Sequence, residues 1–226
     1  MATAPVAVPR RTAGRRAMPG RRRSATAVVV AVLGALVGLA GVEHGIGEML
    51  QGPVRPDGLF ILSWPDAAAL EVLSGEPAMT VVPNLLVTGV LAVLVGLAVA
   101  VWSIWFAGRR HGGLVLVGLS VALLLVGGGL VSPVMGVVLG AVATRIGSAS
   151  PRSPGRFGSG IAPAWPWFLV AALVGYLGLM PGMVLAGAWG IASEALVIGL
   201  AAVAFTGFGL ALAAACAHDR LQTATS

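Results

Sequence analysis

Three polar side chains near residue 44 have the types and the spacing needed to bind a ligand. Glu48 follows His44 by four residues, and Gln51 follows Glu48 by three. If the apolar run before them continues as a helix to Leu50, the helical period places all three within about 60° of one another. Imidazole and carboxylate groups together can relay protons, bind a divalent cation or hold a polar solute. We therefore treat His44, Glu48 and Gln51 as a candidate ligand-binding site.

Other acidic residues on the same predicted side of the membrane are candidates to complete this site. Glu71 and Glu76 follow in the next polar segment, and we include Glu194, which precedes the last apolar run, among the candidate ligands. Glu43 falls about 100° from His44 on the helix and is expected to face water or a neighbouring helix. The alternative interpretation is that these residues form only the hydrated polar end of a helix.

The sequence alone predicts no metal ion and no cofactor. A metal site needs three or four converging ligands, and His44 is the only histidine expected on its side of the membrane. The sequence also lacks the phosphate-binding, nucleophile-elbow and zinc-protease motifs that would indicate an enzyme. An enzymatic function is therefore the least favoured class, and no catalytic residue is proposed.

The segments that carry these residues are strongly apolar. Of the 226 residues, 58% are hydrophobic and 10% are charged, with a mean hydropathy of +0.96. Soluble domains have roughly 25% charged residues, so the composition excludes a soluble globular domain. The single cysteine, Cys216, excludes a disulfide framework. The sequence predicts an all-α, polytopic membrane protein whose main partner is the lipid bilayer.

Six apolar segments are candidate transmembrane helices, because a bilayer core requires about 20 apolar residues per helix. They cover residues 25–50, 85–106, 114–131, 133–146, 164–180 and 192–217. An arginine-containing loop precedes the fifth segment, and residues 193–194 suit the start of the final helix. The bundle thus extends over residues 25–217.

The fourth segment is short, and its boundaries depend on local signals. Ser132 and Pro133 suit an N-cap and a first helical position, while the glycine triplet 127–129 allows a sharp turn. These signals favour a tight helical hairpin over residues 114–146, and one long bent helix is the alternative.

Three segments lie outside the predicted bundle helices. Residues 1–24 are expected to be a disordered, arginine-rich cytoplasmic tail, and residues 218–226 a cytoplasmic C-terminal tail. Residues 52–82 form the longest outer loop. Within it, residues 67–73 can form an amphipathic helix at the membrane interface, and the alternative is an ordinary loop anchored to the membrane by Trp64 and Phe60.

The arginines predict the orientation of the bundle, because basic residues are retained on the cytoplasmic side. All fourteen basic residues are arginines, and seven of them precede residue 24. Six crossings place thirteen arginines and Asp219 inside, and leave Arg55 and seven acids outside. The two faces then carry formal charges of +12 and −6. The net charge of +6 therefore indicates orientation in a bacterial-type plasma membrane, with both termini cytoplasmic, and no nucleic acid partner.

Glycines recur at helical spacing in two of the predicted helices. Gly34, Gly38, Gly41 and Gly45 form one stripe, and Gly136, Gly140, Ala143 and Gly147 repeat that spacing. Small residues allow helix backbones to approach closely in lipid. The two stripes are expected to pack against another helix, either each other, a second copy of the chain or a partner protein.

Two functional classes remain open from the sequence. The polar residues beside a glycine-lined face favour a small transporter or channel-like protein that binds a cation, a proton or a small polar solute near the outer face. The alternative is a non-catalytic assembly or anchoring component with a protein partner. The composition is similar to that of small multi-span proteins of bacteria with GC-rich genomes, a likeness that implies no function.

Overall fold

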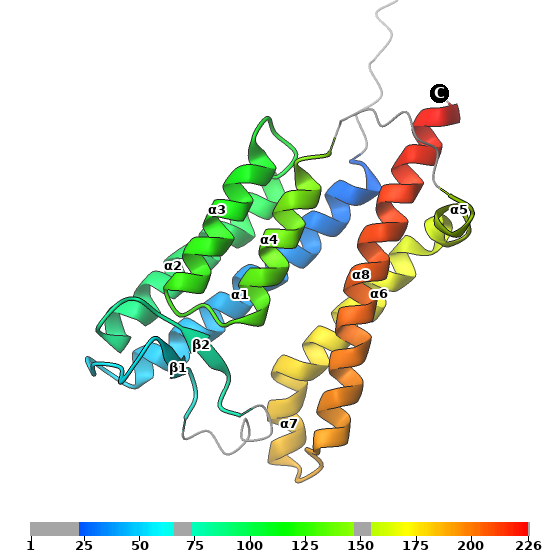
Figure 1. The fold of residues 1–226 in the computed structure, drawn as a ribbon. Helices are drawn as coiled ribbons and strands as arrows, with labels where there is room; N and C mark the ends of the chain where they lie inside the picture. Colours follow the sequence, from blue (N-terminus) through cyan, green and yellow to red (C-terminus); the bar gives the residue numbers. More distant parts are fainter. Residues whose placement is uncertain (1–22, 66–73, 147–154, 226) are drawn as a thin grey trace, which may run out of the picture.

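The computed structural model describes residues 23–65, 74–146 and 155–225 of the chain, and these are mostly helical (Figure 1). The elements are α1 (Ala25–Leu50), β1 (Phe60–Leu62), β2 (Pro77–Met79), α2 (Leu85–Trp105), α3 (Gly112–Leu125), α4 (Val131–Ala143), α5 (Arg156–Ile161), η2 (Ala162–Ala164), α6 (Trp165–Leu177), η3 (Gly178–Gly182), α7 (Met183–Ala188) and α8 (Glu194–Thr225). The elements from α5 to α7 follow one another without a break and form a single helical segment, Arg156–Ala188.

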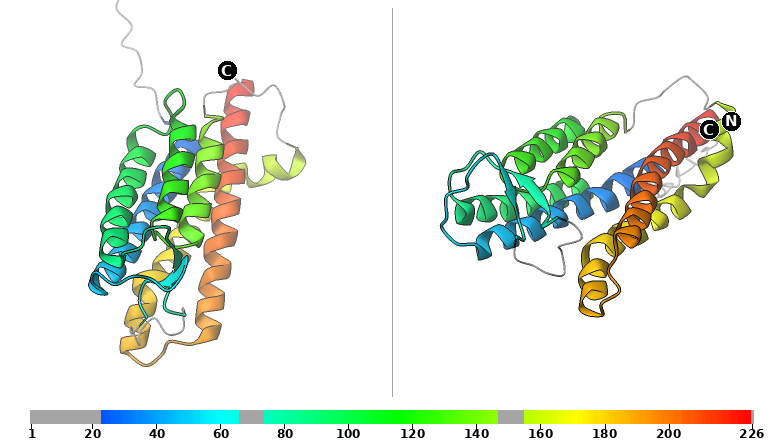
Figure 2. Two further views of the ribbon diagram at one scale, coloured as in Figure 1. Left: turned by 60° about the vertical axis from the view of Figure 1, so that its left-hand side comes forward. Right: turned by 60° about the horizontal axis from the view of Figure 1, so that its bottom comes forward.

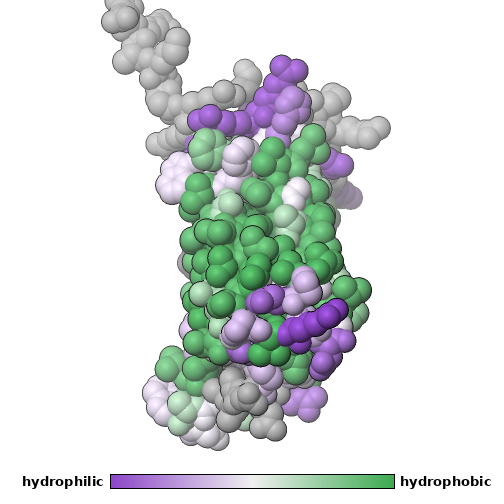
Figure 3. Space-filling view, turned by 90° about the vertical axis from the view of Figure 1, so that its left-hand side faces the viewer, coloured by the Kyte–Doolittle hydropathy of each residue, from purple (hydrophilic) through white to green (hydrophobic). Residues whose placement is uncertain are grey.

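Four helical segments are long and apolar enough to cross a membrane: α1, α2, Arg156–Ala188 and α8. The helices α3 and α4 are apolar but shorter, with 14 and 13 residues. The space-filling view shows an apolar band with polar residues toward its two ends (Figure 3). The predicted tail 1–22, the predicted interfacial helix 67–73 and the loop residues 147–154 lie outside the described residues.

The first helix begins at two side-chain caps. Ser24 Oγ accepts a hydrogen bond from the Ala27 amide at 3.2 Å. The carboxylate of Asp219, in α8, accepts hydrogen bonds from the amides of Ala25 and Thr26 at 2.8 and 2.9 Å. These bonds satisfy amide groups that a helix start otherwise leaves free. They also place the start of the first helix and the end of the last at the same end of the bundle.

The glycine stripe of α1 packs against α2. A Cβ added to Gly45 would lie 2.6 Å from the Gly89 carbonyl oxygen, and one added to Gly96 would lie 2.6 Å from that of Gly38. In α4, a Cβ on Gly140 would lie 2.8 Å from the carbonyl oxygen of Gly113 in α3. The two stripes therefore serve contacts within the chain, each with a neighbouring helix and not mainly with each other.

Residues 112–143 form a helical hairpin and not one bent helix. Gly127 and Gly129 turn the chain with φ angles of 93° and 86°, which glycine adopts without steric cost. The second helix begins at Val131, so the predicted N-cap at Ser132 is wrong. The Ser132 hydroxyl instead donates to the Gly128 carbonyl at 3.4 Å, at the hairpin connection.

A short β-hairpin corrects the all-α prediction. The strands β1 and β2 pair antiparallel, with Ile61 opposite Ala78. Beyond β2, the amide of Val81 donates to Leu125 O at 3.0 Å, and the amide of Gly127 donates to Met79 O at 2.9 Å. The hairpin therefore covers the connection between α3 and α4, whose helices are too short to span a bilayer core alone.

The helices α6 and α8 form a second antiparallel unit beside α1. The Gly207 position of α8 lies against Ala172 of α6, where an added Cβ would be 2.6 Å from the Ala172 nitrogen. The end of α8 reaches Thr225, beyond the predicted end at residue 217, while Ser193 caps its start as expected by accepting from the Leu196 amide at 3.3 Å. Figure 2 shows this unit on one side of α1, with α2, α3 and α4 on the other.

Candidate functional site

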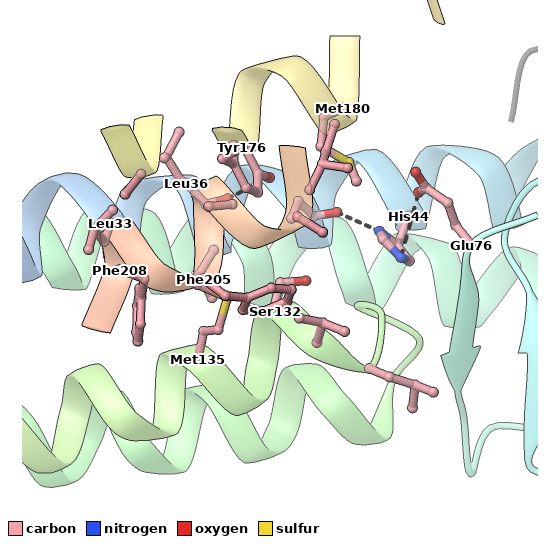
Figure 4. Close-up of a pocket in the computed structure, with 18 of the residues that line it drawn as sticks. Leu33, Leu36, His44, Glu76, Ser132, Met135, Tyr176, Met180, Phe205 and Phe208 are labelled. Carbon is pink, nitrogen blue, oxygen red and sulfur yellow. Dashed lines mark hydrogen bonds and ion pairs between the residues drawn. The ribbon is translucent and has the colours of Figure 1, made fainter. Parts of the chain in front are cut away.

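The polar side chains gather where the end of α1 meets the β-hairpin. His44 and Glu48 come from α1, Glu76 directly precedes β2, and Ser63 directly follows β1. The first three are buried, with 6%, 0% and 5% of their surfaces exposed. Figure 4 shows His44 and Glu76 pointing toward one another at one end of a cavity. Two segments about 30 residues apart in the sequence thus form one site.

The hydrogen bonds of His44 determine which ring nitrogen carries the proton. Its Nδ1 lies 3.0 Å from the carbonyl oxygen of Ala40 and 2.9 Å from Glu43 Oε2. The Ala40 carbonyl oxygen can only accept, so Nδ1 is protonated and donates to it, while the contact with Glu43 is an ion-pair distance without a hydrogen bond. The other nitrogen, Nε2, lies 3.7 Å from Glu76 Oε2. His44 therefore directs its Nε2 toward the Glu76 carboxyl group.

The structure places Glu43 in this cluster, contrary to the prediction that it faces away from His44. Its backbone position is indeed one residue from His44, but the side chain is long enough to bring Oε2 to the imidazole. The side chain is 32% exposed and so connects the cluster with the surface. One ligand atom from each of Glu43, His44 and Glu76 lies within 4.8 Å of the other two.

Glu48 lies one turn further along α1 and is completely buried. Its Oε1 accepts a hydrogen bond from Ser63 Oγ at 3.4 Å, a long and weak contact. Its Oε2 has no hydrogen-bond partner in the part of the chain that the structure describes. A buried carboxyl oxygen without a partner is costly, so the fold gains no stability from this group.

The glycine turn between α3 and α4 forms one wall of the site. A Cβ on Gly129 would lie 2.8 Å from His44 Nε2, and one on Gly127 would overlap the Glu48 carboxyl group. Only a chain without side chains at these two positions can approach both polar groups so closely. The sequence predicted the turn but not its contact with the site.

The backbone before β2 is strained in a way that places Glu76 inside. Ser74, Gly75 and Glu76 have φ angles of 55°, 68° and 54°. A left-handed conformation costs a residue other than glycine roughly 1 kcal/mol. Such strain is concentrated at functional sites. Ser74 and Glu76 both adopt this unfavourable conformation, which their residue types would not predict from the sequence.

Burial raises the pKa of Glu76 to about 8, and the neighbouring Glu43 carboxylate adds to the rise, while His44 opposes it. The end of α1 carries the negative end of the helix dipole and has no basic residue in its last turn. Both features make the surroundings of Glu76 unfavourable for further negative charge. A bound cation would relieve this repulsion.

Two of the predicted ligands lie outside the cluster. Gln51 donates from Nε2 to the carbonyl oxygens of Leu62 and Ser63, at 3.0 and 3.1 Å. It therefore holds the end of β1 in place and acts as a positioning residue. Glu194 is exposed in the first turn of α8, where the helix dipole favours it. Glu71 lies outside the described residues.

An apolar cavity of about 300 Å³ extends from the cluster between α1, α4, α6 and α8 (Figure 4). Its lining includes Leu33, Met135 and Phe208, with His44 and Glu76 at one end. The hydroxyl of Tyr176, which also lines it, donates to the Leu36 carbonyl at 3.1 Å and is thereby satisfied. The polar cluster thus has an apolar space on its inner side.

No protein-family model matches the chain, and no curated protein or solved structure is significantly similar to it. The function must therefore be argued from the geometry of the site.

Proposed function

We propose that this protein is a small multi-pass membrane transporter that binds a cation at the buried cluster near its outer face. The observation that carries the proposal is the arrangement of three acidic side chains around one imidazole, which leaves the cluster short of positive charge when the acids are ionised. Glu43, Glu48 and Glu76 surround a single imidazole, and no arginine forms an ion pair with them among the described residues. Arg55, the basic residue nearest to them in sequence, is exposed. A cation supplies the missing positive charge.

The burial of these acids supports a binding site over a hydrated helix end. Glu48 and Glu76 are 0% and 5% exposed, whereas acids at a hydrated helix end remain accessible to water. Ionisable groups buried in membrane proteins are costly and usually line a pathway for an ion or a solute. A protein that only anchors a partner would gain nothing from the free-energy cost of burying these acids.

The apolar cavity favours a transporter over an open channel. Along α1, His44 and Leu33 are separated by about 16 Å at 1.5 Å per residue, and the cavity wall between them is apolar. An apolar lining offers few ligands to replace the hydration shell of an ion. This arrangement favours a conformation in which the cation site is closed on its inner side. Release of the cation to the inside then requires α6 and α8 to move relative to α1.

The same proposal includes six membrane crossings with both termini on the cytoplasmic side. The contact between Asp219 and the start of α1 supports an even number of crossings. The α2–α3 connection, the end of α4 and the C-terminus lie at that same end, and the β-hairpin lies at the other (Figure 1). In a Cys216→Ala background, Arg110→Cys should react with an impermeant maleimide only from the cytoplasmic side, and Asp57→Cys only from outside.

Ion flux in proteoliposomes tests the proposed function. Vesicles that contain the wild-type protein should accumulate an ion, whether H⁺, Na⁺ or a divalent cation, several-fold faster than vesicles with Glu76→Gln. The control is Glu194→Gln, which makes the same chemical change at an exposed position outside the cluster. Equal rates for all three proteins and for empty vesicles would refute transport, and a stoichiometric membrane partner would then support an assembly role.

A further inference from the structure

We infer that Glu43, His44 and Glu76 bind a first-row divalent transition-metal ion such as Zn²⁺, through His44 Nε2 and one oxygen of each carboxylate. This inference rests on the proposed function and specifies the cation. One ligand atom of each residue already lies within 4.8 Å of the other two. Neither the spacing of these residues in the sequence nor any resemblance to another protein predicts the set.

The donor atoms determine the class of metal. Imidazole nitrogen is a preferred ligand of Zn²⁺, Fe²⁺, Ni²⁺ and Cu²⁺, and carboxylate oxygens complete many such sites. Ca²⁺ requires six to eight oxygen ligands, and Mg²⁺ keeps several water molecules in an octahedron. The apolar cavity beside Glu76 offers neither six oxygen ligands for Ca²⁺ nor a shell of water molecules for Mg²⁺. A site with one nitrogen and two carboxylates therefore suits a transition metal better than Ca²⁺ or Mg²⁺.

His44 has the orientation of a metal ligand. Metal-bound histidines usually donate their second ring N–H to a carbonyl or a carboxylate, which fixes the tautomer and the ring plane. His44 Nδ1 donates in this way to Ala40 O at 3.0 Å. The free lone pair is therefore on Nε2, the atom that faces Glu76. The imidazole needs no rotation to bind a metal.

The separations are close to those of a metal centre. Bonds of about 2.0–2.2 Å imply roughly 3.3–3.6 Å between the ligand atoms of a tetrahedral zinc site. His44 Nε2 and Glu76 Oε2 are 3.7 Å apart. Glu43 must move furthest, and its partly exposed side chain is the one with the freedom to do so. Binding thus requires the Glu43 side chain to rotate from the Nδ1 side of the imidazole, where its Oε2 lies 2.9 Å from the ring, toward Nε2.

An unpartnered buried oxygen provides independent support. Glu76 Oε2 has no hydrogen bond within the described ranges, although the residue is only 5% exposed and points at His44. Buried polar atoms in folded proteins nearly always have a partner, so an orphaned one indicates a missing ligand. With two carboxylates, a divalent ion gives a neutral site, which the apolar surroundings favour.

Cobalt binding to the purified protein in detergent tests this inference. After treatment with a chelator, Co²⁺ should bind at one ion per chain and give visible d–d absorption, and Zn²⁺ should abolish that absorption by displacement. His44→Ala and Glu76→Gln should each weaken binding about 100-fold or more. Glu43→Gln, at the exposed edge of the cluster, should weaken Co²⁺ binding about 10-fold, and this substitution does not alter the buried residues. Glu194→Gln should bind as the wild type does.

The outcomes separate this inference from the proposed function. If the wild type and Glu76→Gln bind Co²⁺ equally weakly and both elute as folded protein, the metal site is refuted. A flux of H⁺ or Na⁺ that still depends on Glu76 would then leave the proposed function standing. Conversely, tight one-to-one metal binding without any ion flux would establish the site and refute transport.

Discussion

Two acidic residues at opposite ends of α1 have opposite effects on the stability of the fold. Asp219 lies at the positive end of the helix dipole, where both of its oxygens accept backbone hydrogen bonds. Glu48 lies near the negative end, with one long hydrogen bond to Ser63 and one oxygen without a partner in the described structure. The first arrangement stabilises a helix and the second destabilises it.

This difference indicates which polar residues must be explained by function. Stability alone accounts for Asp219, because it satisfies amide groups that would otherwise lack partners. Stability does not account for Glu48, or for Glu76, which is held inside by a strained backbone. Proteins retain such costly groups mainly at binding sites, where the stability lost is recovered when the ligand binds.

The largest expected effect is the pH dependence of unfolding at the end of α1 that carries the cluster. Its cause is the raised pKa of Glu76, about 8 against an ordinary 4.5, which follows from burial and from the Glu43 carboxylate. The folded state then holds a proton that the unfolded state releases, so this contribution to stability is complete below pH 4.5 and is lost as the pH rises to about 8. Thermal unfolding in detergent with a chelator should show this fall. Glu76→Gln should show a smaller fall than the wild type, because the buried Glu48 carboxyl group remains, and identical pH profiles would contradict the assignment.

At the other end of α1, Asp219→Ala should lower the free energy of unfolding by about 2–3 kcal/mol, because it removes two hydrogen bonds from a charged acceptor to the helix start. Metal affinity should remain unchanged, because the cluster lies at the opposite end. Asp57→Ala, at an exposed position, is the matched control for thermal unfolding and should have little effect. A loss of metal affinity in Asp219→Ala would show that the two ends are not independent.

The contrast predicts that Glu48→Met acts in the opposite direction to Asp219→Ala. Methionine fills a similar volume without an unpartnered oxygen, so the metal-free protein should gain about 1–2 kcal/mol of stability. Thermal unfolding of the two variants, measured side by side, gives the comparison directly. If Glu48→Met is instead destabilised as strongly as Asp219→Ala, Glu48 is a structural residue and the interpretation of the outer end must change.

The smallest effect is expected at the glycine turn. Gly129→Ala should cost about 1 kcal/mol, because alanine at a φ of 86° is strained and its Cβ would displace the His44 ring. Metal affinity should fall about 10-fold. In Gly118→Ala, the new methyl group meets no atom within 4 Å in the middle of α3, so stability should rise slightly. Cobalt titration and thermal unfolding measure both quantities; equal affinities for the two variants would remove the turn from the site.

The apolar segments were predictable because uncharged runs of about 20 residues rarely occur outside membrane-spanning helices. The predicted segment 25–50 matches the bounds of α1, because the apolar run begins at Ala25; the capping role of Ser24 was not predicted. The β-hairpin was missed because three-residue strands give no periodic signal. The helix α8 continues past residue 217, where the predicted membrane span ends, and Asp219 and Arg220 are part of it although they look like tail residues in sequence.

The site was predictable only where it lies on a single helix. His44 and Glu48 share a face because of the helical period. Glu76 is brought to them by a turn with three left-handed residues, and Glu43 by the flexibility of its own side chain, neither of which follows from spacing. The role of Gln51 also depends on β1, an element that the sequence did not predict.

The bond between Asp219 and the start of α1 has a consequence for membrane insertion. Helix α1 is synthesised first and α8 last, so the amides of Ala25 and Thr26 meet their acceptor only after nearly the whole chain has left the ribosome. The order of synthesis thus delays the final positioning of the first helix until the last one arrives. A chain whose translation stops before α8 lacks the acceptor for these two amides, so Ser24 alone caps its first helix.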